Sequence, residues 1–283
     1  PNESTNLYEG LELGLKKLDN DRVTSVILVT DGVTNTGILD PKEFAALMKQ
    51  YDVRVFGFLM GNNSNWPLME VVTKGSGGFY AAVSNADDIV GQIMLAKSKI
   101  LSESLHDATL SVRGVKVSDV TDEFIGKVYR GQQLVILGRY EEAGTATVRL
   151  QAKLSGADTV YQTTFDFPET DTAYPEIERL WAMNQIETIQ YKTNIGEASP
   201  QEGKQAIEDL GVAYQLVTDE TSMVVLSDTV FGQYGIERRN KARTAIEHQA
   251  QSVRAQNPVR ANRVDAAAPM FPPAFWMSFR RMF

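Results

Sequence analysis

The chain has 283 residues, 43% of them hydrophobic, and a net charge of −8, so it can hold one large domain or two modest ones with a sizeable core. It has no cysteine and two histidines, which excludes thiolate metal sites, thiol nucleophiles and disulfides and disfavours imidazole-rich metal centres and Ser-His-Asp hydrolysis. The acidic balance argues against general nucleic-acid binding, and no apolar run approaches the roughly 20 residues of a membrane span.

The first hundred residues alternate between helical and strand patterns. Leucines at helical spacing predict a helix over 6–19, with Asn6 and Glu9 as its capping box. The apolar run Val26–Val29 predicts a strand over 23–30 that is buried on both faces. The next expected elements are a helix over 41–50 opened by Asp40 and Pro41, a strand over 53–59, a helix over 68–74, a strand over 78–83 and a helix over 86–103. Such alternation with short connections predicts a parallel, helix-covered sheet.

Beyond about residue 106 the pattern changes to alternating segments separated by turns, typical of an antiparallel sandwich or barrel. The expected strands lie within 108–120, 132–140, 146–154 and 159–167. They are followed by helices over 175–191 and 200–210, short strands over Ala213–Val217 and Met223–Leu226, and a polar helix from about 228 to 255. The predicted class is therefore α/β, a partial doubly wound sheet followed by an antiparallel β module and a helical C-terminal region. We expect the parts to be 1–105, 106–170, 171–231 and 232–283.

Asp31 is the residue that most clearly indicates a functional site. It follows the predicted strand over 23–30, at the carboxyl edge where open α/β sheets bind their ligands. A lone carboxylate there favours a hard cation or a catalytic role. The alternative is structural, because an Asp after a strand often caps a turn through its own backbone.

Thr30-Asp31-Gly32, with Ser4-Thr5-Asn6-Leu7 upstream, resembles a von Willebrand factor type A domain. Such domains hold a divalent cation in a metal-ion-dependent adhesion site, built from an Asp-x-Ser-x-Ser loop, a Thr in a second loop and an Asp after the fourth strand. The resemblance implies that Thr5 and Asp31 are metal ligands, for Mg²⁺ or Ca²⁺. It also implies that the first strand and its loop precede Pro1, so that we expect this chain to be a fragment with weak or absent metal binding.

Later segments resemble proteins like the inter-alpha-trypsin inhibitor heavy chains, which join a vault/inter-alpha-trypsin (VIT) domain to a type A domain and have bacterial members. The segments that carry this resemblance are GQQLVILGRYEEAG, FDFPE, ERLWAMNQIETI and LGVAYQLVTDETSMVVLSD. The resemblance runs from about residue 4 to about residue 255. It implies a non-catalytic adhesion protein, extracellular, at the cell surface or periplasmic, whose metal site binds an Asp or Glu of a partner protein.

Two other functions stay open from the sequence. One is a Mg²⁺-dependent enzyme that uses Asp31, although no second acidic cluster, nucleophile–base pair or phosphate loop accompanies it. The other is a purely structural scaffold in which the metal is incidental.

The sequence also predicts which partners the chain needs or lacks. We expect the strand over 23–30 to need a neighbour, either the missing N-terminal part or another chain, because an unpaired apolar edge is a template for strand addition. A monomeric chain that unfolds cooperatively would contradict this.

The basic segment 237–255 has no interleaved aromatic residues and is expected to be a solvated helix, with no nucleic acid as partner. The end of the chain, 257–283, is expected to be a linker followed by the aromatic tail Met270–Phe283, which we expect to dock on the protein itself in preference to a partner or a membrane surface.

Overall fold

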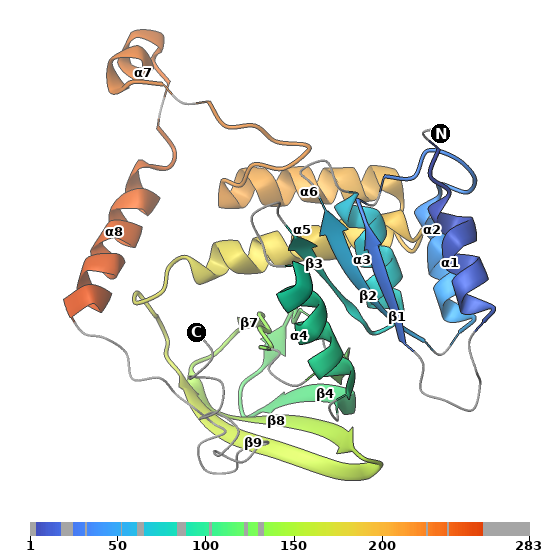
Figure 1. Ribbon diagram of the computed structural model, residues 1–283. Coiled ribbons are helices and arrows are strands. Elements are labelled where there is room, and N and C mark those ends of the chain that lie inside the picture. The colour runs from blue at the N-terminus through green and yellow to red at the C-terminus, as the bar shows by residue number, and fades with distance from the viewer. Residues whose placement is uncertain are drawn as a thin grey trace.

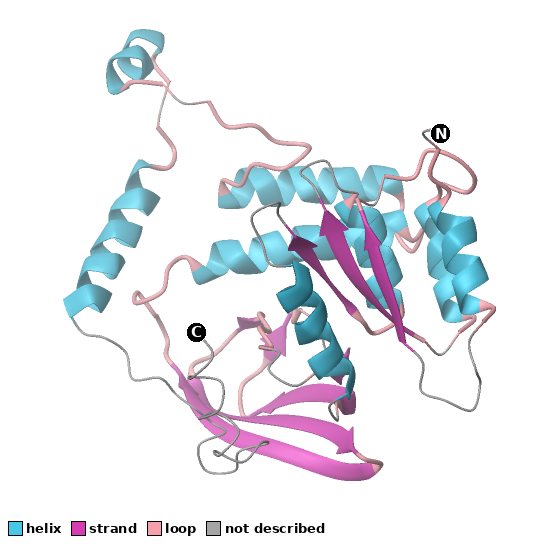
Figure 2. Ribbon diagram, in the orientation of Figure 1, coloured by secondary structure: helices cyan, strands magenta, loops and turns pink. Residues whose placement is uncertain are grey.

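The computed structural model describes residues 4–17, 25–31, 33–51, 53–60, 65–83, 89–101, 104–121, 124–129, 133–224, 226–236 and 238–256. A three-stranded sheet with helices around it, two antiparallel sheets and four C-terminal helices make up this part of the chain (Figures 1 and 2). The α/β class followed by an antiparallel module and helices is confirmed. The predicted tail 257–283 lies outside the described residues.

The N-terminal part alternates helices and strands as the sequence predicts. Its elements are α1 (Leu7–Leu15), β1 (Ser25–Thr30), α2 (Pro41–Lys49), β2 (Arg54–Met60), α3 (Trp66–Gly75), β3 (Phe79–Val83) and α4 (Ile89–Leu101). The strands pair in parallel in the order β1-β2-β3. The expected caps are present, because the Asn6 side chain accepts from the Glu9 N–H at 3.1 Å and the Asp40 carboxylate accepts from the Lys42 N–H at 3.0 Å.

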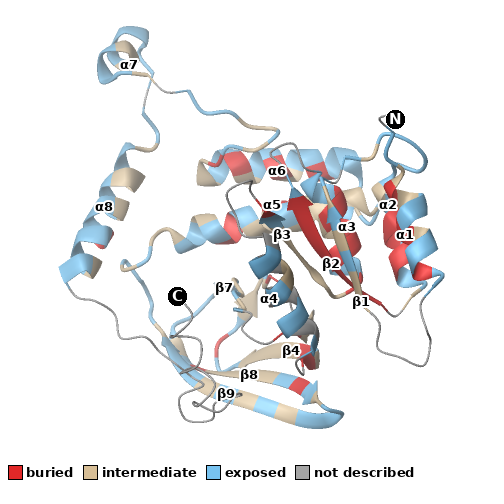
Figure 3. Cartoon of the chain, viewed as in Figure 1, coloured by how far each residue is buried: buried red, intermediate tan, exposed pale blue. Residues whose placement is uncertain are grey.

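The prediction that the first strand is buried on both faces is wrong. Ile27 and Val29 of β1 are 42% and 45% exposed, whereas β2 is buried along Arg54–Leu59 (Figure 3). On one face Val26 and Leu28 pack against the core formed with α1, α2 and α3. On the other face α4 packs through Ile93 on Phe58 and Val83, which belong to β2 and β3. Among the described residues β1 pairs with β2 alone, so it is an edge strand.

The antiparallel part consists of two small sheets. Its strands are β4 (Leu105–Arg113), β5 (Val117–Ser118), β6 (Phe124–Val128), β7 (Arg139–Tyr140), β8 (Gly144–Leu154) and β9 (Ala157–Phe167). The larger sheet has the order β6-β4-β8-β9, and β5 pairs with β7.

Two strand predictions in this module are corrected. β6 was not expected, since Gly126 at φ +74° interrupts its alternation where the pairing with β4 shifts register. Of the strand expected over 132–140, only Arg139 and Tyr140 form a strand in the described residues. The segment before them is held by a pair of loop bonds instead, because Thr121 and Leu137 exchange two hydrogen bonds of 2.7 and 2.9 Å.

The C-terminal helices are α5 (Ile177–Asn194), α6 (Pro200–Tyr214), α7 (Asp228–Tyr234) and α8 (Lys241–Gln256). The expected strands over Ala213–Val217 and Met223–Leu226 are absent from the described residues there, because α6 continues through Gly211 and ends at a left-handed Gln215. Gly211 is required for packing, since a Cβ at that position would lie 2.7 Å from the Thr221 hydroxyl. The single polar helix expected from about 228 to 255 is in fact two helices, because Gly235, with a φ of +61°, ends α7.

Aromatic and polar contacts join the three parts. Tyr129, next to β6, packs its ring edge-on against Phe56 of β2, with ring centroids 5.6 Å apart, and its hydroxyl donates to the Gly77 carbonyl. Burial raises the pKa of this Tyr129 hydroxyl. The α5 side chain Trp181 donates from its ring N–H to the Asp119 carbonyl of the antiparallel part at 2.9 Å.

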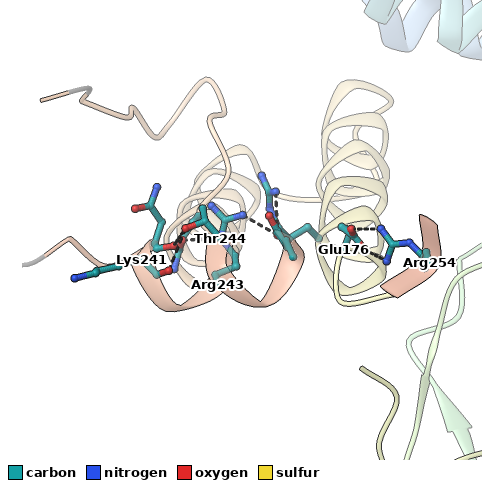
Figure 4. A network of polar contacts seen from close by, with 9 residues as sticks. Glu176, Lys241, Arg243, Thr244 and Arg254 are labelled. Carbon is teal, nitrogen blue, oxygen red and sulfur yellow. Dashed lines mark hydrogen bonds and ion pairs between the residues drawn. The ribbon is translucent and has the colours of Figure 1, made fainter. Parts of the chain in front are cut away.

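The arginines of α8 are engaged within the protein (Figure 4). Arg254 pairs with Glu176 at 2.7 Å and lies over the Tyr174 ring, with its guanidinium carbon 5.1 Å from the ring centroid. Arg243 pairs with Glu247 at 2.8 Å, and Glu247 lies 3.6 Å from Arg179 of α5. These pairs neutralise much of the helix's positive charge.

We expect the attachment of α8 to weaken in acid. The hydrogen bond from Arg254, and after it a backbone hydrogen bond, hold the pKa of Glu176 below its ordinary value. A lowered folded-state pKa stabilises the fold above the unfolded pKa of about 4.3 and the stabilisation is lost as pH falls through the lowered value. NMR chemical shifts of α8 recorded from pH 6 to pH 3 should therefore report loss of its packing in acid.

The variant Glu176→Gln should show that loss already at pH 6, because it removes the charge that Arg254 pairs with. Glu178→Gln, two residues further along α5, is the matched control and should keep the wild-type pH profile. An α8 whose shifts in Glu176→Gln match the wild type at pH 6 would contradict this role.

Candidate functional site

Asp31 stands at the carboxyl end of β1, as predicted, and is exposed. Its carboxylate Oδ1 accepts from the Val33 N–H at 3.0 Å, so the side chain caps the turn that follows the strand. Its carbonyl accepts from the Asn65 N–H at 3.3 Å, which ties the end of β1 to the start of α3. The turn-capping alternative is therefore realised with one carboxylate oxygen, and no hydrogen bond engages Oδ2 within the described residues.

Thr5, the second predicted site residue, is held against the loop that follows Asp31. Its N–H donates to the Asn35 side-chain oxygen at 2.7 Å. Its carbonyl accepts from the Asn35 N–H at 3.1 Å, the Thr36 N–H at 3.3 Å and the Thr34 hydroxyl at 3.0 Å. The structure thus brings the N-terminus of α1 and the loop after β1 into one cluster at the carboxyl edge of the sheet.

The other residues that build this cluster were not indicated by the sequence analysis. Thr34 also accepts from the Leu7 N–H at 3.3 Å, so one hydroxyl joins both segments. Gly37 adopts φ +79° against the Asn6 side chain, where a Cβ would lie 2.4 Å from Oδ1. Asn65 caps α3 by accepting from the Leu68 N–H at 3.2 Å. The signal for this cap was available, because Asn65 lies two residues before Pro67 in the first turn of the helix.

The donor atoms suit a hard divalent cation in kind but not in number. A carboxylate and a hydroxyl are the oxygen ligands that Mg²⁺ and Ca²⁺ prefer, yet each ion takes about six or more. Across the described ranges, no group of three or more His, Cys, Asp or Glu side chains could hold a metal ion. Asp31 and Thr5 therefore do not form a complete cation site with the residues that the structure describes.

Residues 1–94 match the family model of the von Willebrand factor type A domain, which agrees with the parallel sheet. Beyond that match, the chain is similar over most of its length to inter-alpha-trypsin inhibitor heavy chains, so both resemblances inferred from the sequence are confirmed.

The similarity is distant. Human inter-alpha-trypsin inhibitor heavy chain H4 is 23% identical over 246 residues, which cover 78% of this chain and 26% of that protein. Heavy chain H1 of Bos taurus is 23% identical over 260 residues, which cover 83% of this chain and 28% of that protein. The chain thus spans about a quarter of the length of the curated relatives it matches. Among solved structures, the ArnB paralog VWA2 from Sulfolobus acidocaldarius is similar, with a TM-score of 0.33 and 14% identity over 76% of this chain and 62% of that chain.

Proposed function

We propose that the chain is part of a non-catalytic protein-interaction or adhesion protein, and that Asp31 and Thr5 contribute to a divalent-cation site that recognises an Asp or Glu of a partner. The type A match and the heavy-chain similarity support the interaction class. The observation that carries the site is the set of four hydrogen bonds between Thr5 and Thr34, Asn35 and Thr36. They fix a hydroxyl-bearing residue beside the loop that Asp31 begins.

The cation site proposed here needs ligands that the described residues lack. With only two protein donors, most of the coordination shell of Mg²⁺ or Ca²⁺ would be water, which gives weak binding. Further ligands come, in this proposal, from an Asp-x-Ser-x-Ser loop and from the partner's carboxylate. We propose an extracellular, cell-surface or periplasmic location, as for secreted adhesion proteins. Within the described residues, no helix has the length and apolarity to cross a membrane.

The metal site is tested with Mn²⁺, whose paramagnetism broadens nearby NMR signals. We expect Mn²⁺ at millimolar concentrations to broaden the amide signals of residues 4–6 and 33–36 before those of other surface loops. The variant Asp31→Asn should weaken this effect at least tenfold, because it replaces the anionic ligand with a neutral amide. Mg²⁺ should compete with the Mn²⁺ and restore the signals.

The matched control is Asp158→Asn on β9, which removes an equal charge far along the chain from the site. It should leave the broadening around Asp31 unchanged. Broadening in Asp31→Asn that equals the wild type, or broadening confined to other carboxylates, would contradict the proposal.

A further inference from the structure

A cavity of about 460 Å³ lies between the parallel sheet and the antiparallel pair of helices α5 and α6. Figure 1 shows these two helices running beside α3 and β3. Trp66 and Tyr80 line the cavity from α3 and β3, and Glu187, Thr193 and Ile207 line it from α5 and α6. Its volume falls in the range of about 300–1,000 Å³ typical of small-ligand sites. We refer to it as the α3–α5 cavity.

One wall of the α3–α5 cavity is aromatic. The rings of Trp66 and Tyr80 lie with their centroids 5.7 Å apart at a tilt of 58°. Trp66 is 39% exposed, so part of its surface is accessible. Aromatic faces, and those of Trp most strongly, attract organic cations through the negative potential above the ring.

The remaining lining carries more negative than positive charge. Glu70, Glu187, Asp219 and Glu220 line the cavity together with one cation, Lys204. Lys204 is paired with Glu220 at 3.0 Å. Glu70 lies 3.8 Å from Lys74, which is outside the lining. In the ranges that the structure describes, neither Glu187 nor Asp219 forms an ion pair.

One further feature of the lining agrees with a cationic ligand. Burial, and after it the charges of Glu70 and Glu187, raise the pKa of the Tyr80 hydroxyl. The two carboxylates therefore place negative charge beside the aromatic wall, where a ligand cation would lie.

We propose that the α3–α5 cavity binds an arginine side chain of a partner protein, with the guanidinium against Trp66 and Tyr80 and charge-paired with Glu187. Arginine suits the site better than lysine, because its planar guanidinium stacks on aromatic rings and presents five N–H donors in a rigid fork. The proposal rests on the proposed role in protein interaction but not on the metal ion. The cavity nevertheless adjoins the Asp31 loop, since Asn65, which bonds to Asp31, directly precedes Trp66.

The experiment uses the 283-residue chain labelled with 5-fluorotryptophan, with the ¹⁹F signal of Trp66 assigned from the Trp66→Phe variant. The probe is N-acetyl-arginine amide, and the comparison probe is N-acetyl-citrulline amide, which has nearly the same shape without the charge. We expect arginine to shift the Trp66 signal in a saturable way at millimolar concentrations. Citrulline should bind at least tenfold more weakly, and the Trp181 signal should not move.

Variants distinguish specific binding in the cavity from a general surface effect. Glu187→Gln should weaken arginine binding at least fivefold, whereas Glu178→Gln, on the same helix but outside the cavity, should leave it unchanged. Unchanged binding in Glu187→Gln, an equal response to citrulline, or the absence of a saturable Trp66 shift would overturn the proposal. Repeating the titration with Asp31→Asn in EDTA separates the two sites, because arginine binding should persist there whether or not Asp31 binds a metal.

Discussion

Replacing Phe56 with alanine should be among the most destabilising single substitutions in this protein. Phe56 is fully buried in the central strand β2, with its ring 4.8 Å from that of Phe79 and 5.6 Å from that of Tyr129, measured between centroids. It therefore connects the parallel sheet with the antiparallel part. We expect Phe56→Ala to lower the free energy of unfolding by about 3–5 kcal/mol, the range observed when a buried Phe leaves a cavity. Urea unfolding followed by circular dichroism measures this loss.

The matched control for this prediction is Phe165→Ala on β9, where the same side chain is 39% exposed. It should cost less than half as much, because a partly exposed ring contributes less burial and leaves a solvent-filled space. If the two variants lose equal stability, Phe56 does not have the central role that its burial indicates.

A second large effect is expected from one added methyl group at Gly78. A Cβ there would lie 1.8 Å from the Val55 carbonyl oxygen, a contact with backbone that no side-chain rotation relieves. The Gly78 N–H also donates to the Thr73 carbonyl at 2.9 Å, so the turn between α3 and β3 is fixed from two sides. We expect Gly78→Ala to destabilise the protein by at least about 2–3 kcal/mol through overpacking.

Gly10→Ala on α1 is the same chemical change, but we expect it to raise the stability of the protein. Apart from its chain neighbours and the backbone of its own helix, no heavy atom lies within 4 Å of the added Cβ at this position, so alanine should stabilise the protein by about 0.5–1 kcal/mol through helix propensity. Thermal unfolding of both variants beside the wild type measures the two shifts. A Gly78→Ala variant as stable as the wild type would mean that the turn has room to move.

Local signals were sufficient wherever neighbouring residues decide the structure. Asn6 and Asp40 cap helices as expected, because a cap needs only the N–H groups two or three residues further along. The end of α6 was misjudged at Gly211, which serves close packing against Thr221 and does not end the helix. A glycine that stops a helix and a glycine that accommodates a neighbour look the same in a sequence.

The position of Asp31 at the end of its strand could be predicted from the sequence, whereas the arrangement of the residues around it could not. Asp31 follows its strand as predicted, whereas the attachment of Thr5 depends on hydrogen bonds to residues about thirty positions away. The α3–α5 cavity is lined by residues more than a hundred positions apart in the chain, such as Tyr80 and Glu187. The expected boundaries between the parts of the chain, after residues 105, 170 and 231, stay predictions.

By itself, the sequence determined the alternation of helices and strands, the parallel sheet and the place of Asp31, because periodicity and strand-end chemistry are local properties. Only the tertiary structure decided that β2 is the central buried strand and β1 an edge among the described residues. An apolar run such as Val26–Val29 fits either position, since burial depends on which helices and strands cover it, and these come from elsewhere in the chain. For the same reason the tertiary structure alone placed Thr5 beside the loop that Asp31 begins.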